Sequence, residues 1–131
     1  MKIVTAIVVA AGISFTLGIG AAYAQGQNPP GVDPTHYQCY RVSEQKPIKA
    51  EAKLKDQFIS WGVKLGRAML LCNPVEKNGE RPKDPDTHLV CYSIPAKNAG
   101  KKVVVRHQFG EQVLTVGGTV FLCLPSIKKV L

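Results

Sequence analysis

The chain has 131 residues, of which 45% are hydrophobic, and 17 lysines and arginines against 9 acidic residues give a formal net charge of +8. This length suffices for one small domain with a hydrophobic core and is too short for several. The charge permits attraction to nucleic acid, acidic glycans or anionic lipid. However, the lysines are spread along the chain rather than clustered, which favours an ordinary soluble basic protein.

Residues 1–24 have the features of a secretory signal peptide. Lys2 precedes an apolar run, and Ala22 and Ala24 occupy the −3 and −1 positions of an A-x-A cleavage site. Glycines interrupt the run, which falls short of the roughly 20 apolar residues that span a bilayer. We therefore expect cleavage near Ala24, an exported protein that is periplasmic or extracellular, and no transmembrane segment in the mature chain.

After a lead-in at residues 25–35, the first half of the mature chain is predicted to form four short strands. These segments are rich in β-forming residues or alternate between apolar and polar residues. Gly66 separates the third segment from the fourth, and the alternative is a single strand bent at this glycine. Pro74 is expected to end the fourth, because proline cannot donate to a strand ladder. The predicted strands are 37–42, 52–58, 63–65 and 68–72.

The second half repeats this pattern after a polar linker, residues 78–87. One offset places His36, Cys39 and Tyr40 on His88, Cys91 and Tyr92, and an offset one residue shorter places Leu71, Cys72 and Pro74 on Leu122, Cys123 and Pro125. The corresponding strands are 89–94, 103–109, 113–116 and 119–123, with Asn98 and Gly100 in the turn between the first two. Two repeats, 36–77 and 88–128, thus form one domain over residues 36–131.

The sequence therefore predicts an all-β fold. Two homologous antiparallel β units are expected to pack against each other as one small sandwich or barrel-like domain, because a single unit would struggle to bury both of its faces. No segment shows sustained helical periodicity.

All four cysteines follow the predicted signal peptide, and their even number in an exported chain indicates two disulfides. No C-x-x-C pair of the kind that binds zinc is present. Because the cysteines lie on the first and last strand of each unit, we favour Cys39–Cys72 and Cys91–Cys123. The pairing Cys39–Cys123 with Cys72–Cys91 would equally respect a twofold relation between the halves.

The duplicated pattern H-x-x-C-Y, Q-F and L-C-x-P resembles an uncharacterised domain family of exported bacterial proteins. The resemblance covers residues 36–128, and the second Q-F is followed by Gly110 as in such relatives, whereas Ile59 follows the first. The resemblance implies a bacterial origin, export and a module often joined to other secreted domains. It implies no activity, substrate or catalytic residue.

No catalytic, metal or cofactor site is expected. No G-x-S-x-G motif surrounds a serine, and disulfide-bonded cysteines are not nucleophiles. The three histidines lack short ligand spacing, and we expect His36 and His88 to make a polar contact at the start of a strand instead. Basic neighbours oppose a calcium site among the linker acids. The residues that we do not expect to bind a metal ion are therefore His36, His88, His107, Glu80, Asp84 and Asp86.

Trp61 is the one aromatic residue that we select as a candidate ligand contact. Tyr40 and Tyr92 recur in both repeats and suit cross-strand packing, whereas Trp61 has no aromatic counterpart and lies beside a turn. Arg41 and Lys64 are the basic residues that we place with it, since aromatic and basic side chains together bind glycans or single-stranded nucleic acid.

The sequence therefore indicates a secreted, non-enzymatic β module that acts through binding or as a structural element at the cell surface or in the periplasm. The alternatives are a binding protein for anionic polymers, namely acidic glycan, lipopolysaccharide or nucleic acid, and a small protease-inhibitor-like module that uses the linker as its loop. A partner would be such a polymer or another secreted protein. Lysines on the second strand can protect a sheet edge, so we expect a monomer.

Overall fold

The structure is a computed structural model that describes residues 27–43 and 46–131. The predicted signal peptide, residues 1–24, lies outside the described residues. Within the described ranges every regular element is a β-strand, and no helix is long and apolar enough to cross a membrane. The prediction of an all-β fold is confirmed.

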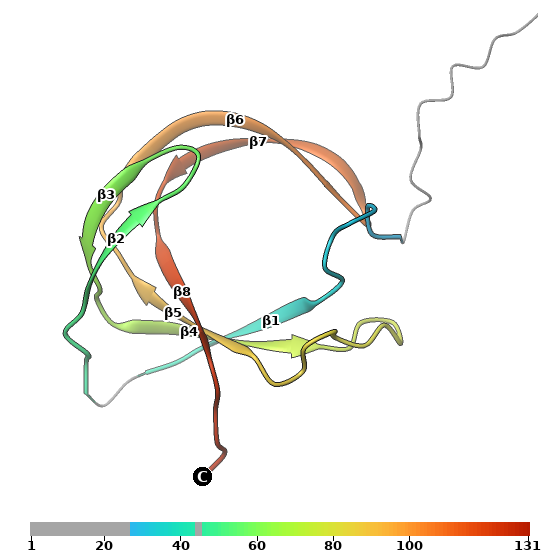
Figure 1. The fold of residues 1–131 in the computed structure, drawn as a ribbon, viewed down its shortest axis with the longest axis horizontal. Coiled ribbons are helices and arrows are strands. Elements are labelled where there is room, and N and C mark those ends of the chain that lie inside the picture. Colours follow the sequence, from blue (N-terminus) through green and yellow to red (C-terminus); the bar gives the residue numbers. More distant parts are fainter. Residues whose placement is uncertain (1–26, 44–45) are drawn as a thin grey trace, which may run out of the picture.

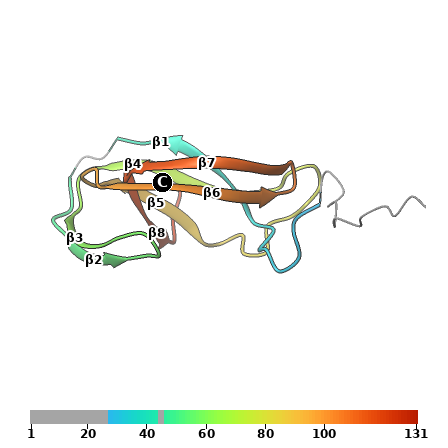
Figure 2. The ribbon, with the colours of Figure 1, turned by 90° about the horizontal axis from the view of Figure 1, so that it is seen from above.

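Four strands form the central antiparallel sheet, in the order β1-β4-β5-β8. β1 (His36–Arg41) and β4 (Ala68–Val75) belong to the first repeat, and β5 (His88–Ser93) and β8 (Phe121–Ser126) belong to the second. The repeats therefore meet where β4 pairs with β5, and β1 and β8 are the two outer strands (Figure 2). One continuous sheet joins the two halves of the chain.

Each repeat also contains a β-hairpin, which lies in the sequence between the two strands that the repeat contributes to the central sheet. β2 (Glu51–Lys55) pairs with β3 (Ser60–Lys64), and β6 (Asn98–His107) pairs with β7 (Gly110–Gly118). Figure 1 shows the long β6–β7 hairpin arching over the molecule opposite the central sheet, with the shorter β2–β3 hairpin at one side. The same order of strands thus occurs in both repeats.

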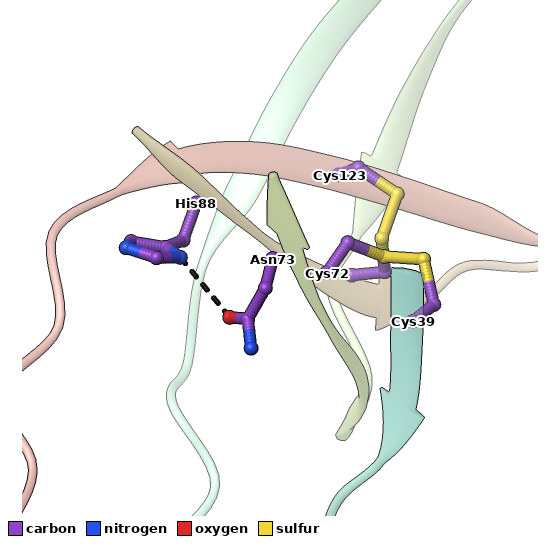
Figure 3. Close-up of a disulfide and its surroundings, with 6 residues drawn as sticks. Cys39, Cys72, Asn73, His88 and Cys123 are labelled. Carbon is purple, nitrogen blue, oxygen red and sulfur yellow. Dashed lines mark hydrogen bonds between the residues drawn. A yellow bond between two sulfur atoms is a disulfide. The ribbon is translucent and has the colours of Figure 1, made fainter. Parts of the chain in front are cut away.

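The two disulfides lie in the middle of the central sheet, and the favoured pairing is confirmed. Cys39 is bonded to Cys72 and Cys91 to Cys123, each across one antiparallel pair of strands (Figure 3). Cys72 and Cys91, on the inner strands, are only 2% and 1% exposed. The only other hydrophobic side chain with comparable burial among the described residues is Val63, so the disulfides occupy the centre of a small core.

The predicted ends of two strands were wrong, because β4 and β8 continue through Pro74 and Pro125. The Cα atoms of each disulfide-bonded pair are 3.9 Å apart, the short spacing of a non-hydrogen-bonded pair. Two residues further on, Tyr37↔Pro74 and Leu89↔Pro125 are pairs of the same kind. The Pro74 nitrogen therefore points away from β1, toward the side of β5, where the pairing has already ended at Cys72↔Leu89. The Pro125 nitrogen points to the open edge of β8, so neither proline removes a ladder bond.

The predicted turn at Asn98 and Gly100 is an irregularity within β6 instead. The pairing with β7 shifts register between Asn98 and Lys101, and Gly100 adopts a φ of 58° while its N–H donates to Asn98 Oδ1 at 3.0 Å. A positive φ favours glycine, and an asparagine side chain readily accepts from the backbone two residues on. Residues that we assigned to a turn thus form a bulged start to the longest strand.

The turn between β2 and β3 depends on a carboxylate. Asp56 accepts hydrogen bonds from the backbone N–H groups of Phe58 at 2.8 Å and Ile59 at 2.9 Å. In the second repeat His107 stands in this place, and its Nδ1 accepts from the Phe109 N–H at 3.1 Å. Different side chains therefore accept hydrogen bonds at the corresponding place in the two turns. Gly110 adopts a φ of 121°, which favours glycine, whereas its counterpart Ile59 has no positive φ.

The Asp56 carboxylate makes the stability of the fold sensitive to acid. Its backbone hydrogen bonds from Ile59 and Phe58 hold the pKa of Asp56 below its usual value. The stabilisation is present above the ordinary aspartate pKa of about 4 and is lost as the pH falls through the lowered pKa of the folded state. We expect Asp56→Asn, which keeps an acceptor, to flatten the acid side of the stability profile, and Asp56→Ala to lower stability at neutral pH.

Thermal denaturation at a series of pH values checks this expectation. Asp33 and Asp84 also have lowered pKa values because of hydrogen bonds from Thr35 and Thr87, so some acid dependence remains in either variant. An Asp56→Asn profile that coincides with the wild-type profile would show that this carboxylate has no part in acid stability.

Candidate functional site

Trp61 lies where the hairpin of the first repeat meets the second repeat. On β3 it is half-buried, on the same face as the buried Val63. It lines an open pocket whose other walls are Leu54, Lys55, Asp56, Ile59, Ile94, Thr119, Phe121 and Leu122. The first four of these come from the β2–β3 hairpin of the first repeat, and the last four from the second repeat, just after β5, before β8 and on β8. The pocket is therefore formed by both repeats.

Lys97 places a cation beside the indole. Its Nζ atom lies 5.4 Å from the centroid of the Trp61 ring, within the range of a cation–π contact. Thr119 fixes the backbone that carries Lys97: its hydroxyl donates to the Pro95 carbonyl at 2.7 Å and accepts from the Lys97 N–H at 2.9 Å. The Thr119 N–H also donates to the Lys97 carbonyl at 3.1 Å. The Lys97 backbone is thus held in place.

The pocket combines an aromatic face with charges of both signs. Lys55 is part of its wall and Lys97 lies over Trp61, while Asp56 contributes a carboxylate whose pKa backbone hydrogen bonds from Ile59 and Phe58 hold below its usual value. An aromatic ring with nearby ammonium groups suits the stacking of a sugar ring or a base that carries an anionic group. The sequence did not predict that Thr119 and Lys97 lie near Trp61, because no motif in the sequence connects these distant positions.

The structure does not bring the other two selected residues to this pocket. Lys64 follows Val63 on β3 and so points to the opposite face from Trp61, where its Nζ lies 3.5 Å from Glu51 Oε1. Both side chains are largely exposed, so this ion pair contributes little stability. Arg41 ends β1 opposite Leu70 and is not among the residues that line the pocket. The roles of Trp61, Arg41 and Lys64 in binding stay predictions.

The two repeated histidines make polar contacts at the starts of their strands. His88 is buried, and its Nδ1 lies 3.0 Å from Asn73 Oδ1 (Figure 3). Its Nε2 lies 3.5 Å from the Lys128 ammonium. Because lysine can only donate, this arrangement places the imidazole proton on Nδ1. His36 Nε2 lies 3.3 Å from Glu80 Oε2, and Asn28 donates to the other oxygen of Glu80 at 2.8 Å.

These contacts connect segments that are far apart in the sequence. His88 and Asn73 join β5 to β4 at the boundary between the repeats, and His36 joins β1 to the turn at Lys77–Glu80. Asn78 and Gly79 occupy that turn with φ angles of 51° and 81°. Within the described ranges, no group of three or more histidine, cysteine, aspartate or glutamate side chains has a geometry that would hold a metal ion.

A comparison with known protein families assigns this chain to a family. A family model described as a repeat of unknown function (DUF7450) matches residues 14–125. No curated protein and no solved structure matches the chain. The expected membership of an uncharacterised domain family is confirmed, while the bacterial origin and the specific H-x-x-C-Y motif stay predictions. Because the family model matches most of the length of this chain, the chain belongs to the DUF7450 family of repeats of unknown function.

Proposed function

We propose that this protein is an exported, non-enzymatic β module that acts outside the cytoplasm of a bacterium as a structural or binding element. The observation that carries the proposal is the joining of two like units, each with its own cross-strand disulfide, through one continuous sheet. Such a sheet suits a rigid extracytoplasmic building block, because disulfides persist in oxidising compartments.

The sparse core agrees with this role. Many large apolar side chains are exposed, among them Val104, Phe109 and Val113 at 57%, 72% and 67%. Two of these, Val104 and Val113, face each other across the β6–β7 hairpin. Apolar groups of this size, exposed together, are typical of surfaces that contact another molecule.

The proposal is tested by comparing stoichiometric binding with turnover. The oxidised protein would be incubated with cell-envelope fractions and, separately, with panels of protease, esterase and glycosidase substrates. We expect saturable retention on envelope material and no product above the buffer control. Product formation that tracks the protein through purification and is abolished by a single point substitution would contradict a non-enzymatic role.

The Trp61 pocket favours a second candidate function, the recognition of an anionic glycan. Trp61, Lys55 and Lys97 together offer one stacking face and two cations, which is the chemistry that an acidic sugar requires. Phosphate and sulfate contacts alone weaken steeply with salt, whereas stacking does not. A specific ligand should therefore remain bound at physiological salt.

Trp61→Ala is expected to weaken binding to such a glycan by about fivefold to 150-fold, because a stacked aromatic contact contributes roughly 1–3 kcal/mol. Binding to arrays of acidic and neutral glycans, lipopolysaccharide and nucleic acid at low and physiological salt provides the measurement. Lys64→Ala is the matched control, since Lys64 lies on the opposite face of β3 and its loss should change binding little. Weakened binding in Lys64→Ala with unchanged binding in Trp61→Ala would contradict stacking on Trp61 and show that charge alone determines binding.

A further inference from the structure

The outer strands of the central sheet are repeat-equivalents of its inner strands. β1 corresponds to β5, and β8 corresponds to β4, yet only β4 and β5 are paired on both sides. From this we propose that the protein assembles head to tail, with β8 of one copy paired to β1 of the next in the manner of the β4·β5 junction. The inference rests on the proposed structural role and names a second copy of this chain as the partner.

The backbone directions at both edges fit such a junction. Cys39↔Cys72 and Cys91↔Cys123 are non-hydrogen-bonded pairs, so the N–H and C=O groups of these cysteines point away from the disulfide-bonded strand. For Cys72 and Cys91 they point into the β4·β5 junction. For Cys39 and Cys123 they point outward, where the sheet ends.

The rest of each edge follows the same alternation. Tyr37 lies two residues before Cys39 on β1, and Phe121 lies two residues before Cys123 on β8, so their backbone groups also face outward. Two repeat-equivalent hydrogen bonds of 3.1 Å confirm this alternation: Val42 N–H donates to the Met69 carbonyl, and Ile94 N–H donates to the Val120 carbonyl. The backbone groups of even-numbered residues along β1 and β8 therefore point toward the neighbouring strand of the same molecule.

Equivalent residues are more exposed on the outer strands β1 and β8 than on the inner strands β5 and β4. Cys72 and Cys91 are 2% and 1% exposed, whereas their counterparts Cys123 and Cys39 are exposed. On β1, the side chains of Tyr37 and Tyr40 are 40% and 49% exposed, whereas those of their counterparts on β5, Leu89 and Tyr92, are half-buried. The side chains that fill the junction inside the molecule are thus presented to solvent at both ends.

The β1 edge also lacks the residues that proteins use to prevent strand addition. Its sequence HYQCYR contains neither lysine nor proline, and its one basic residue, Arg41, stands at the end. The lysines that led us to expect a monomer lie on β2, which belongs to a separate hairpin and not to the central sheet. Edge protection by those lysines therefore does not apply to β1.

The internal junction also sets the register of the proposed contact. Inside the chain Leu70 pairs with Cys91, Leu71 with Val90 and Cys72 with Leu89. Repeat equivalence converts these pairs to Phe121 with Cys39, Leu122 with Gln38 and Cys123 with Tyr37 of the next copy. The β4·β5 pairing ends before Pro74, and Pro125 ends the proposed pairing at the corresponding point.

Sedimentation velocity of the oxidised protein, as its host exports and processes it, tests the proposal. We expect species beyond a dimer to grow with concentration, because a head-to-tail contact leaves one edge open at each end. Phe121→Pro and Tyr37→Pro each remove one outward N–H group and no bond within the molecule. Each variant alone should assemble at least about tenfold more weakly than wild type.

Mixing the two variants gives the sharpest result. The intact β8 of Tyr37→Pro can pair only with the intact β1 of Phe121→Pro, so the mixture should form a one-to-one dimer and stop. A monomeric wild-type protein at all concentrations, or proline variants that assemble like wild type, would overturn the proposal. Turnover of a substrate would contradict the proposed function and leave this interface unaffected, so the two failures are distinguishable.

A cross-link that leaves the backbone of both edges unchanged serves where a proline variant does not fold. Gln38→Cys and Leu122→Cys, mixed as two single variants, should form a disulfide between copies, because their positions face each other in the proposed register. Tyr40→Cys with Leu122→Cys is the control for register and should not cross-link faster than random collision. Equal cross-linking of both mixtures would contradict this register.

Discussion

Removal of either disulfide is expected to lower the free energy of unfolding by about 3–4 kcal/mol, because each bond closes a long loop in the unfolded chain. The bonded residues are separated by 33 and 32 positions, so the two double variants Cys39→Ala/Cys72→Ala and Cys91→Ala/Cys123→Ala should lose similar amounts. A domain of this size typically has about 5–15 kcal/mol of stability in all. Loss of both bonds should therefore leave the chain largely unfolded.

Urea denaturation of the two double variants and of the fully reduced protein measures these losses. The small core makes the effect decisive, since Cys72, Cys91 and Val63 are the buried hydrophobic side chains among the described residues. A loss below about 1 kcal/mol for either double variant would show that strand pairing alone holds the central sheet together.

Gly66→Ala is expected to destabilise the protein by about 1–3 kcal/mol through overpacking at the boundary between the repeats. A Cβ atom at this position would collide with Ser93 Oγ and lie 3.1 Å from the Ser93 carbonyl oxygen. The Gly66 N–H donates to that carbonyl at 2.8 Å, and Ser93 Oγ accepts from the Arg67 N–H at 3.1 Å. The substitution thus disturbs the bonds that join β5 to the residues before β4.

Gly117→Ala is the matched control, because Gly117 is the repeat-equivalent of Gly66 and an added Cβ there meets no atom within 4 Å. Its free energy of unfolding should remain close to that of wild type. Ser93→Ala should partly rescue Gly66→Ala by removing the colliding hydroxyl. Equal destabilisation by the two glycine substitutions, measured by urea denaturation, would contradict the account of the junction.

The sequence repeat predicted most of the fold because each copy supplied an independent indication of the same strands. The cysteines on first and last strands pointed to the correct pairing, since antiparallel strands at the two ends of one unit place such residues opposite each other. The ends at Pro74 and Pro125 were wrong because the rule against proline in a ladder depends on which way the nitrogen points. That direction is determined by the pairing, which the sequence does not contain.

The candidate site was less accessible to sequence reasoning. Trp61 was predicted from its lack of a repeat counterpart, but half of the other residues that line its pocket come from the other repeat, as does Lys97. Lys64 was placed with it by proximity in the chain, although neighbouring residues of a strand face opposite ways. Contacts between repeats depend on how the hairpins fold over the sheet, and no local pattern encodes that arrangement.

The most direct test of the account is amide hydrogen exchange at the four cysteines, measured at low and at high protein concentration. In dilute solution the Cys72 and Cys91 amides, which point into the β4·β5 junction, should be protected, and the Cys39 and Cys123 amides should exchange rapidly. At high concentration the latter two should become protected together as copies pair. Protection of Cys39 and Cys123 equal to that of Cys72 and Cys91 in dilute solution would contradict free edges. Rapid exchange of the Cys39 and Cys123 amides at every concentration would contradict head-to-tail assembly.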